Sequence, residues 1–215
     1  MNDIIQLLPD SVANQIAAGE VIQRPASVIK ELVENSIDAG ATLINVVCVD
    51  SGRTSIQVTD NGKGMSETDA RLSFERHATS KIRQADDLFN LHTMGFRGEA
   101  LAAINSIAEL ALLSRANDQS NAWMLDGRTG ELKPAARAGG TTVEVKELFF
   151  SVPARRKFLK TDATELAHCI EAVRRHALAR PDVGFAIWHD GKLVEQWRRQ
   201  GDGDAARTQR IGDVL

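Results

Sequence analysis

The sequence predicts an α+β fold in which a mostly antiparallel sheet carries helices, and three observations lead to this prediction. Residues 24–40 have the apolar spacing of an amphipathic helix. Residues 43–49 and 54–60 read as strands and are joined by a turn. A second pair of alternating runs flanks Asp190-Gly191, which is a strong hairpin signal. Strands joined by such short turns pair antiparallel.

The remaining elements follow from the same rules. The first helix is expected to begin at Asp10 or Ser11 and to run through Ala18, with Gly19 ending it. Residues 200–206 have the composition of a linker. Further helices are expected at 66–76, 98–107 and 161–179, and further strands at 109–115, 122–126, 131–136, 141–148, 185–189 and 192–197.

Composition and charge are those of an ordinary globular protein. Of the 215 residues, 43% are hydrophobic and 26% are charged, and the formal net charge is -3 at pH 7. This mildly acidic balance argues against a small protein that binds nucleic acid tightly at all times. Cys48 and Cys169 have neither a metal-ligand spacing nor a disulfide framework, so we expect buried free thiols. Neither a signal peptide nor a run of about 18 apolar residues is present, which predicts a cytoplasmic protein without a membrane span.

The expected helix at 24–40 has two faces of different character. Glu31, Asn35 and Asp38 stand at i, i+4 and i+7, so their side chains line up on one stripe. A carboxylate one turn from a carboxamide is suited to orienting a water beside an oxygen-ligated cation. The alternative is a set of solvated polar residues on an ordinary amphipathic helix. The other stripe is apolar and is expected to face the core; it consists of Val28, Ile29, Leu32, Val33 and Ile37.

A second candidate site lies where a strand ends. In a strand, Ile56, Val58 and Asp60 point to the same side, so the alternation that buries two aliphatic residues also carries a carboxylate toward the core. A buried carboxylate needs hydrogen-bond donors, and the exocyclic amine of adenine is a suitable one. Gly62 and Gly64 allow a tight turn and the approach of a flat ring. The alternative is a plain turn whose backbone N–H groups satisfy Asp60.

Residues 93–101 suggest a phosphate site. Gly95 and Gly98 open a helix, which exposes backbone N–H groups and the positive end of the helix dipole. The run is not a P-loop, because the Gly-Lys-Ser/Thr ending is missing, and it is not a dinucleotide fingerprint, because no strand feeds directly into it. The alternative is a helix N-terminus without a ligand.

In this order and spacing, the motifs resemble the ATP-binding module of the GHKL superfamily, which includes gyrase B, heat-shock chaperones and histidine kinases. Longer runs are similar to the MutL family of DNA mismatch repair proteins, and the resemblance covers about residues 4 to 199. Gyrase-type and kinase-type relatives share only the nucleotide-site motifs. The runs similar to the MutL family are 14–21, 24–28, 30–36, 38–42, 76–82, 95–101 and 153–159.

The resemblance implies a two-layer sandwich of a mixed, mostly antiparallel sheet with helices packed on one face. It also implies Mg²⁺-dependent hydrolysis of ATP to ADP and phosphate, with Glu31 as the general base and Asn35 as the Mg²⁺ ligand. Asp60 matches the adenine-reading carboxylate, whereas Asp38 is open between a nucleotide contact and a structural hydrogen bond. The implied cofactor-binding residues are Asn35, Asp38, Asp60, Gly64, Met65, Thr79, Ser80, Lys81, Gly95, Phe96, Arg97, Gly98 and Thr141.

Two loops, 79–81 and 95–98, match the phosphate lid of the family. Residues 77–93 are composed suitably for an order change around the γ-phosphate, which in the family is thought to drive homodimerisation of the N-terminal arms. Arg97 is open between touching the nucleotide and bracing Glu34.

The family implies further partners and a further domain. Basic residues at 155–160, 174–180 and 198–199 suggest a sequence-independent DNA-binding face, against the alternative of a solvated charge run. Mismatch-recognition and downstream repair proteins are the other implied partners. We expect residues 1–200 to form the ATPase domain, and residues 201–215 to form a linker and the start of a truncated second domain. Because that domain supplies a lysine to the γ-phosphate in the family, hydrolysis by this chain alone is expected to be weak.

Two functions remain open at this point. One is an ATPase whose nucleotide state gates assembly in mismatch repair, and the other is a nucleotide-binding interaction module that signals by shape with negligible catalysis. A histidine kinase is disfavoured, because no phosphoacceptor helix precedes the site and His77 lies in the lid region.

Overall fold

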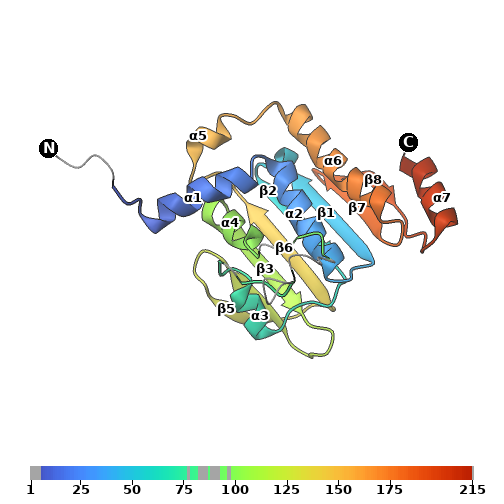
Figure 1. Ribbon diagram of the computed structural model, residues 1–215, viewed down its shortest axis with the longest axis horizontal. Helices are drawn as coiled ribbons and strands as arrows, with labels where there is room; N and C mark the ends of the chain where they lie inside the picture. Colours follow the sequence, from blue (N-terminus) through green and yellow to red (C-terminus); the bar gives the residue numbers. More distant parts are fainter. Residues whose placement is uncertain (1–5, 77, 82–86, 88–92, 96–97, 215) are drawn as a thin grey trace.

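The computed structural model describes residues 6–76, 78–81, 87, 93–95 and 98–214. These residues form one sheet of eight strands in the order β5-β4-β3-β6-β2-β1-β7-β8. Neighbouring strands are antiparallel, except that β1 and β7 run parallel (Figure 1). The predicted α+β class with a mixed, mostly antiparallel sheet is therefore confirmed.

The strands begin and end within two residues of the predicted positions. The turn between β7 and β8 has positive φ at Asp190 (48°) and Gly191 (77°), as a two-residue hairpin turn requires. Between β1 and β2 the chain instead makes a one-turn 3₁₀ helix (Asp50–Gly52). The strands are β1 (Leu43–Val49), β2 (Ser55–Asp60), β3 (Glu109–Arg115), β4 (Ala122–Asp126), β5 (Leu132–Ala135), β6 (Gly140–Lys146), β7 (Gly184–His189) and β8 (Lys192–Trp197).

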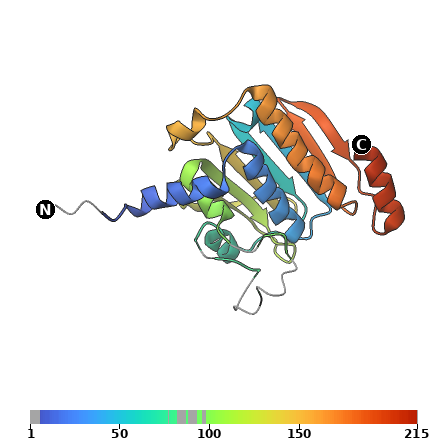
Figure 2. The ribbon, with the colours of Figure 1, turned by 45° about the horizontal axis from the view of Figure 1, so that its top comes forward.

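The main helices cover the sheet from one side. Figure 2 shows α1, α2, α4 and α6 on the same side of the strands. Among the described residues, no helix is both long and apolar enough to cross a lipid bilayer. The helices are α1 (Asp10–Val21), α2 (Pro25–Asp38), α3 (Glu67–Leu72), α4 (Ala100–Ile107), α5 (Pro153–Arg156), α6 (Asp162–Ala179) and α7 (Asp204–Val214).

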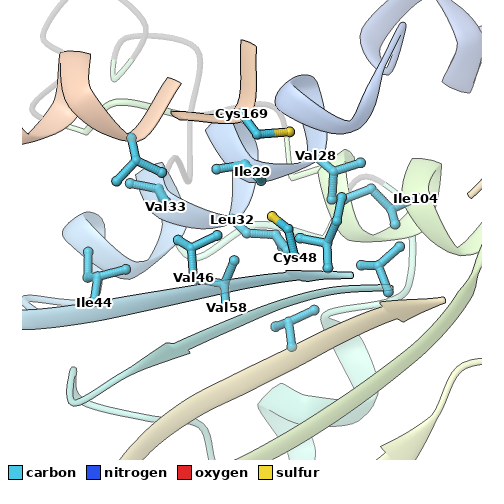
Figure 3. Close-up of a cluster of buried hydrophobic side chains, with 14 of the residues drawn as sticks. Val28, Ile29, Leu32, Val33, Ile44, Val46, Cys48, Val58, Ile104 and Cys169 are labelled. Atoms are coloured by element: carbon cyan, nitrogen blue, oxygen red, sulfur yellow. The ribbon is translucent and has the colours of Figure 1, made fainter. Parts of the chain in front are cut away.

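The core lies between these helices and one face of the sheet. All five residues of the predicted apolar stripe of α2 are buried, and they pack over the central strands (Figure 3). Asp60 and Thr141 lie at strand ends on the same buried face, so any site built on them borders the core. The buried apolar residues of the four central strands are Ile44, Val46 and Cys48 of β1, Ile56 and Val58 of β2, Leu110 and Leu112 of β3, and Val143 and Val145 of β6.

The two cysteines are buried and free, as predicted. Cys48 belongs to β1 and Cys169 to α6, so they lie where this helix packs on the sheet (Figure 3). A hydrogen bond with Cys48 and burial both raise the pKa of the Cys169 thiol. The thiol therefore stays protonated and unreactive.

Helix α1 does not end at Gly19, and that prediction was wrong. The helix continues to Val21, and the guanidinium of Arg155 occupies the space where a Cβ of residue 19 would stand. Glycine leaves room here for a side chain from α5, and the helix tolerates it at a modest cost. Helix α3 is also shorter than predicted, since it ends at Leu72.

The C-terminal segment forms a docked helix after the linker-like residues. Helix α7 begins at Asp204 and packs on α6 and β8. Its Arg210 is fully buried, although arginine is seldom buried unless it is well hydrogen-bonded. Arg210 donates to the backbone carbonyls of Ala177, Arg180, Pro181, Val183 and Arg198.

Candidate functional site

Helix α2 presents the candidate residues on its partly exposed stripe. Pro25 occupies the first turn, where its missing N–H is tolerated, and the buried apolar stripe fixes how the helix is rotated. Glu31, Asn35 and Asp38 therefore face the same way, and all three are partly exposed. Ser36 is buried and faces the sheet instead.

Asn35 and Asp38 contact Lys81. The Nζ of Lys81 donates to Asn35 Oδ1 at 3.0 Å and to Asp38 Oδ2 at 2.5 Å. Asp38 also accepts hydrogen bonds from the backbone N–H groups of Met94 (3.0 Å) and Gly95 (3.3 Å). The Asp38 side chain is only 7% exposed. Asp38 thus fastens residues 81, 94 and 95 to α2.

The oxygens of Asn35 and Asp38 form a position that accepts a cation, because they hold the ammonium group of Lys81. Among the described residues, no group of three or more His, Cys, Asp or Glu side chains could enclose a metal ion. Mg²⁺ does not need such a cage, since it keeps several waters and takes substrate phosphates as ligands. A single amide oxygen from Asn35 fits this pattern.

Asp60 ends β2 with its carboxylate buried against α2. Its Oδ2 accepts from the Ser36 hydroxyl at 2.9 Å, and its Oδ1 accepts from the N–H groups of Gly62 (2.8 Å) and Thr141 (3.3 Å). Burial raises the pKa of Asp60, and these hydrogen bonds oppose the shift. A carboxylate has about four acceptor positions, so a further donor from a ligand can still be accommodated.

Met65 and Thr141 meet at Ser114, a buried residue of β3. Ser114 Oγ accepts from the Met65 N–H at 2.9 Å and lies 2.8 Å from the Thr141 hydroxyl. Gly64 has a φ of +68°, and a Cβ on it would collide with the backbone of Arg115. Glycine at this position is therefore required by the close approach of the turn to the end of β3.

The two lid loops pack together at Gly98. Its φ is +62°, and a Cβ would collide with the backbone of Ala78 and approach the Thr79 side chain to 2.7 Å. The Thr79 hydroxyl accepts from the N–H of Lys81 at 3.1 Å, and Ser80 is exposed. The predicted site residues Phe96 and Arg97 lie outside the described residues.

Glu31 belongs to a charged network on α2. The Nζ of Lys30 donates to Glu31 Oε1 at 3.2 Å and to Glu34 Oε2 at 3.0 Å. The Nε2 of His176 in α6 lies 3.4 Å from Glu34 Oε1, and its Nδ1 lies 2.7 Å from the Ala172 carbonyl oxygen. Burial favours the neutral form of Glu34, but the hydrogen bonds from His176 and Lys30 outweigh it and lower the pKa of Glu34.

Several contacts of the site were not predicted. Ser36 could have been suspected, because it lies one turn after Leu32 on the buried side of α2. Arg137 donates to the Asp60 carbonyl, and His176 lies against Glu34. No local pattern marks these last two residues, because each meets its partner across a long stretch of sequence.

Glu31, Asn35 and Asp60 do not line the cavity beside α1. That cavity has a volume of about 450 Å³ and lies between α1 and α4, next to Phe74 and Arg76. Lys81 occupies the space beside Asn35 and Asp38. Asn35 and Asp38 thus contact Lys81, and the next residue after Asn35, Ser36, contacts Asp60.

Comparisons with known proteins agree with this geometry. Residues 23–137 match the family of histidine kinase-, DNA gyrase B- and HSP90-like ATPases. The chain is 62% identical over 194 residues to the DNA mismatch repair protein MutL of Phocaeicola vulgatus, which covers 89% of this chain and 31% of that protein. It is 51% identical over 214 residues to the MutL of Edwardsiella ictaluri, covering 98% of this chain and 33% of that protein. The chain thus spans about a third of the length of these curated relatives.

A solved structure is similar in fold and in sequence. The Aquifex aeolicus MutL ATPase domain complexed with ADP superposes with a TM-score of 0.70 at 30% identity, over 90% of this chain and 69% of that chain. The sequence match, the shared fold and the motifs on α2 and β2 all lead to the same family. The chain belongs to the histidine kinase-, DNA gyrase B- and HSP90-like ATPases and, among them, to the ATPase domains of the MutL mismatch repair proteins.

Proposed function

We propose that the chain binds ATP and Mg²⁺ beside α2 and hydrolyses the nucleotide to ADP and phosphate. The observation that carries this proposal is the placement of neighbouring residues on α2. Asn35 accepts from Lys81 of the lid, and the next residue, Ser36, donates to Asp60. An ATP molecule lying along the helix would then place its adenine at Asp60 and its phosphates near Lys81.

The base end of this ligand is assigned to Asp60 and its neighbours. The Asp60 carboxylate would accept a hydrogen bond from the exocyclic amine of adenine. Thr141 already donates its N–H to Asp60 and would help to hold the ring. Gly64 and Met65 form the turn beside it.

The reaction would depend on Glu31 as general base. When bound, Mg²⁺ would neutralise charge on the phosphates, and Asn35 would be its protein ligand. Glu31 lies one turn before Asn35 and would orient the attacking water and accept its proton. Lys30 donates to Glu31 Oε1 at 3.2 Å, which leaves other acceptor positions of the carboxylate for the water.

The phosphate end is assigned to the lid loops. Thr79, Ser80 and Lys81 would face the phosphates together with the backbone of residues 95–98, which include Phe96 and Arg97. Lys81 would exchange Asp38 for a phosphate oxygen, since both are anions within its reach. Ordering of the lid would thereby depend on the γ-phosphate.

The whole protein is proposed to act in mismatch repair as an ATP-dependent clamp. Dimerisation of N-terminal arms is supported by exposed apolar side chains, namely Val12 and Ile16 on α1 and Leu8 just before it. Through this dimer, ATP would couple mismatch-recognition proteins to downstream repair proteins. We further propose that residues 1–200 are the ATPase domain and that residues 201–215 lead into a second domain.

We propose that DNA contacts fewer of the basic residues than the sequence suggested. Four of the basic side chains in the predicted face pair with acids, namely Arg156 with Glu147, Arg174 with Glu195, Arg175 with Glu171 and Arg180 with Asp182. Lys157, Lys160 and Arg198 remain as candidates for phosphate contacts. Loss of DNA affinity with added salt would test this face, and a flat salt response would exclude it.

The cytoplasm is the proposed location, because two buried free cysteines suit a reducing compartment.

A set of three variants tests the nucleotide site. Glu31→Ala should bind ATP about as well as the wild type but hydrolyse it at least 100-fold more slowly, because a general base acts in the transition state. Asn35→Ala and Asp60→Ala should lose binding. Nucleotide affinity by calorimetry and single-turnover hydrolysis measure the two effects. Equal loss of affinity in all three variants would contradict the assignment.

A second candidate function is a nucleotide-binding module that signals by shape with negligible catalysis. The ion pair between Lys30 and Glu31 favours it, since this contact engages the proposed base. A single-turnover rate that is the same in the wild type and in Glu31→Ala would favour this function over the ATPase.

A further inference from the structure

Arg137 lies in the connection between β5 and β6 and reaches three neighbouring strands. Its Nη1 donates to the carbonyl of Leu113 in β3 at 2.9 Å and to the hydroxyl of Thr142 in β6 at 3.0 Å. Its Nη2 donates to the carbonyl of Asp60 in β2 at 3.2 Å, and its Nε donates to the carbonyl of Ala138 at 3.0 Å. Four hydrogen bonds hold the planar guanidinium in one orientation.

The hydrogen bond to Asp60 stands where the strand ladder has ended. Pairing between β2 and β6 stops at Thr59 and Thr142, one residue before Asp60. On its other side, Asp60 is still paired with Ile44 of β1. Arg137 therefore ties the last residue of β2 on the side where no strand partner remains.

The loop that carries Arg137 also packs on Asp60 through its backbone. Gly140 has a φ of +102°, and a Cβ on it would collide with the Asp60 carbonyl oxygen and lie 2.8 Å from the Cα of Asn61. The next residue, Thr141, donates its N–H to Asp60 Oδ1. The loop thus contacts Asp60 at its carbonyl and at its carboxylate, and a shift of the loop would move the carboxylate.

The charge of Arg137 acts on the same side chain. Burial raises the pKa of Asp60, and the nearby guanidinium of Arg137 opposes this. Burial lowers the pKa of Arg137 in turn, and the Asp60 carboxylate opposes that. Only an ionised carboxylate has both oxygens free to accept, so Arg137 favours the form that an amine donor needs.

We propose that Arg137 is a positioning residue for recognition of the base, which acts by holding the backbone and the charge state of Asp60. This inference rests on the proposed role of Asp60 as the acceptor for the adenine amine. Arg137 itself does not touch the nucleotide in this proposal. Its effect should therefore depend on whether the ligand has an exocyclic amine.

The test compares ATP with purine riboside triphosphate, which differs only in lacking that amine. The wild type should bind ATP about tenfold more tightly than the analogue, because a buried carboxylate is left without its donor. Arg137→Met keeps the length of the side chain and removes all donors. It should weaken ATP binding about five- to tenfold, change the affinity for the analogue less than twofold, and so abolish the discrimination.

Two further variants make the result decisive. Arg137→Lys keeps the charge but cannot reach three acceptors, so its discrimination should be intermediate. Arg128→Met removes an exposed arginine and should change neither affinity. Thermal unfolding checks that each variant is folded. If Arg137→Met does not fold, Arg137→Lys takes its place in the test.

The outcomes separate this inference from the proposed function. If Arg137→Met weakens both ligands by the same factor, the residue only stabilises the loop and the inference is wrong. If Asp60→Asn leaves the wild-type discrimination unchanged, Asp60 does not read the amine and the proposed role of Asp60 fails first. Loss of discrimination in both variants supports both statements.

Discussion

The hydroxyl of Ser36 is shared between two acceptors. It lies 3.0 Å from the Leu32 carbonyl oxygen and 2.9 Å from Asp60 Oδ2, and a hydroxyl has one hydrogen to donate. While Asp60 is ionised, the hydroxyl can donate to only one of the two acceptors at a time. A protonated carboxyl would resolve this by donating to Ser36, which has the same direction as the raised pKa that burial gives Asp60.

Asp60→Asn is therefore expected to stabilise the protein in the absence of nucleotide by about 1 kcal/mol at pH 7. The amide NH₂ can donate to Ser36, which then donates to Leu32. The amide oxygen still accepts from Gly62 and Thr141, as Oδ1 does now. Urea unfolding at pH 7 measures the gain.

The pH dependence of this gain gives its control. The folded-state pKa of Asp60 is raised above its unfolded value, so the wild type is favoured at low pH and loses this stability as the pH rises through the folded pKa. The advantage of Asp60→Asn should thus shrink toward zero below about pH 3, where the wild-type carboxyl is neutral in both states. An equal advantage at both pH values would show that ionisation is not the cause.

At the scale of elements, a Cβ added at either of two glycines would meet a neighbouring group, and the two groups differ in how easily they can move. A Cβ at Gly19 in α1 would meet the end of the Arg155 side chain, which can swing away. A Cβ at Gly140, where β6 begins, would meet the backbone of Asp60, which is held by Arg137 and by the strand ladder. The same substitution should therefore have opposite effects at these two places.

Gly19→Ala is expected to raise the free energy of unfolding by about 0.5–1 kcal/mol, because alanine is the better helix former. Gly140→Ala is expected to lower it by about 2 kcal/mol or more, since φ is +102° there and the collision is with backbone. Urea unfolding of the pair measures both. Destabilisation by Gly19→Ala would mean that Arg155 cannot move and is itself a structural anchor of α1.

Helices and strands could be predicted from the sequence where buried residues recur at a short, regular spacing. Ile44, Val46 and Cys48 alternate in sequence and are buried together, which is why β1 was found with its correct ends. Helix α7 was not predicted from its residues, because the side chain that docks it, Arg210, reads as a solvated charge. Gly19 was misread for a related reason, since its neighbour Arg155 belongs to a distant element.

The candidate site was predictable to the same extent. Glu31, Asn35 and Asp38 share one stripe of α2 because one helix sets their spacing, and Asp60 points inward as strand alternation predicts, while their roles stay predictions. The contact between His176 and Glu34 joins residues 142 positions apart, so no local spacing could show it. Resemblance to a family extended the site along motifs, but it did not reach loop residues such as Arg137.

At the scale of the whole molecule, the N-terminal and C-terminal parts of the chain meet in the core. Strand β1 pairs in parallel with β7, and α2 packs beside α6 (Figure 1). The helix of the nucleotide site therefore rests on the C-terminal part of the chain. Helix α7 covers the end of α6, and Arg210 connects α7 to the loop between α6 and β7.

Arg210→Met is expected to release α7 from this position. Five buried or partly buried carbonyls lose this donor, and water can replace it only if α7 moves away. We expect a loss of about 2–4 kcal/mol in the free energy of unfolding and rapid proteolysis at residues 201–203.

Arg207→Met is the matched control, because Arg207 lies on the same helix but is 71% exposed and pairs only with Asp204. It should change stability by less than about 0.5 kcal/mol and leave the linker resistant. Nucleotide affinity shows whether the release of α7 also disturbs the nucleotide site on α2. If Arg210→Met frees α7 while ATP still binds normally, α7 is an independent attachment; if affinity falls as well, α6 transmits the loss to α2. A linker that stays resistant in Arg210→Met would show that apolar packing, and not Arg210, holds α7 in place.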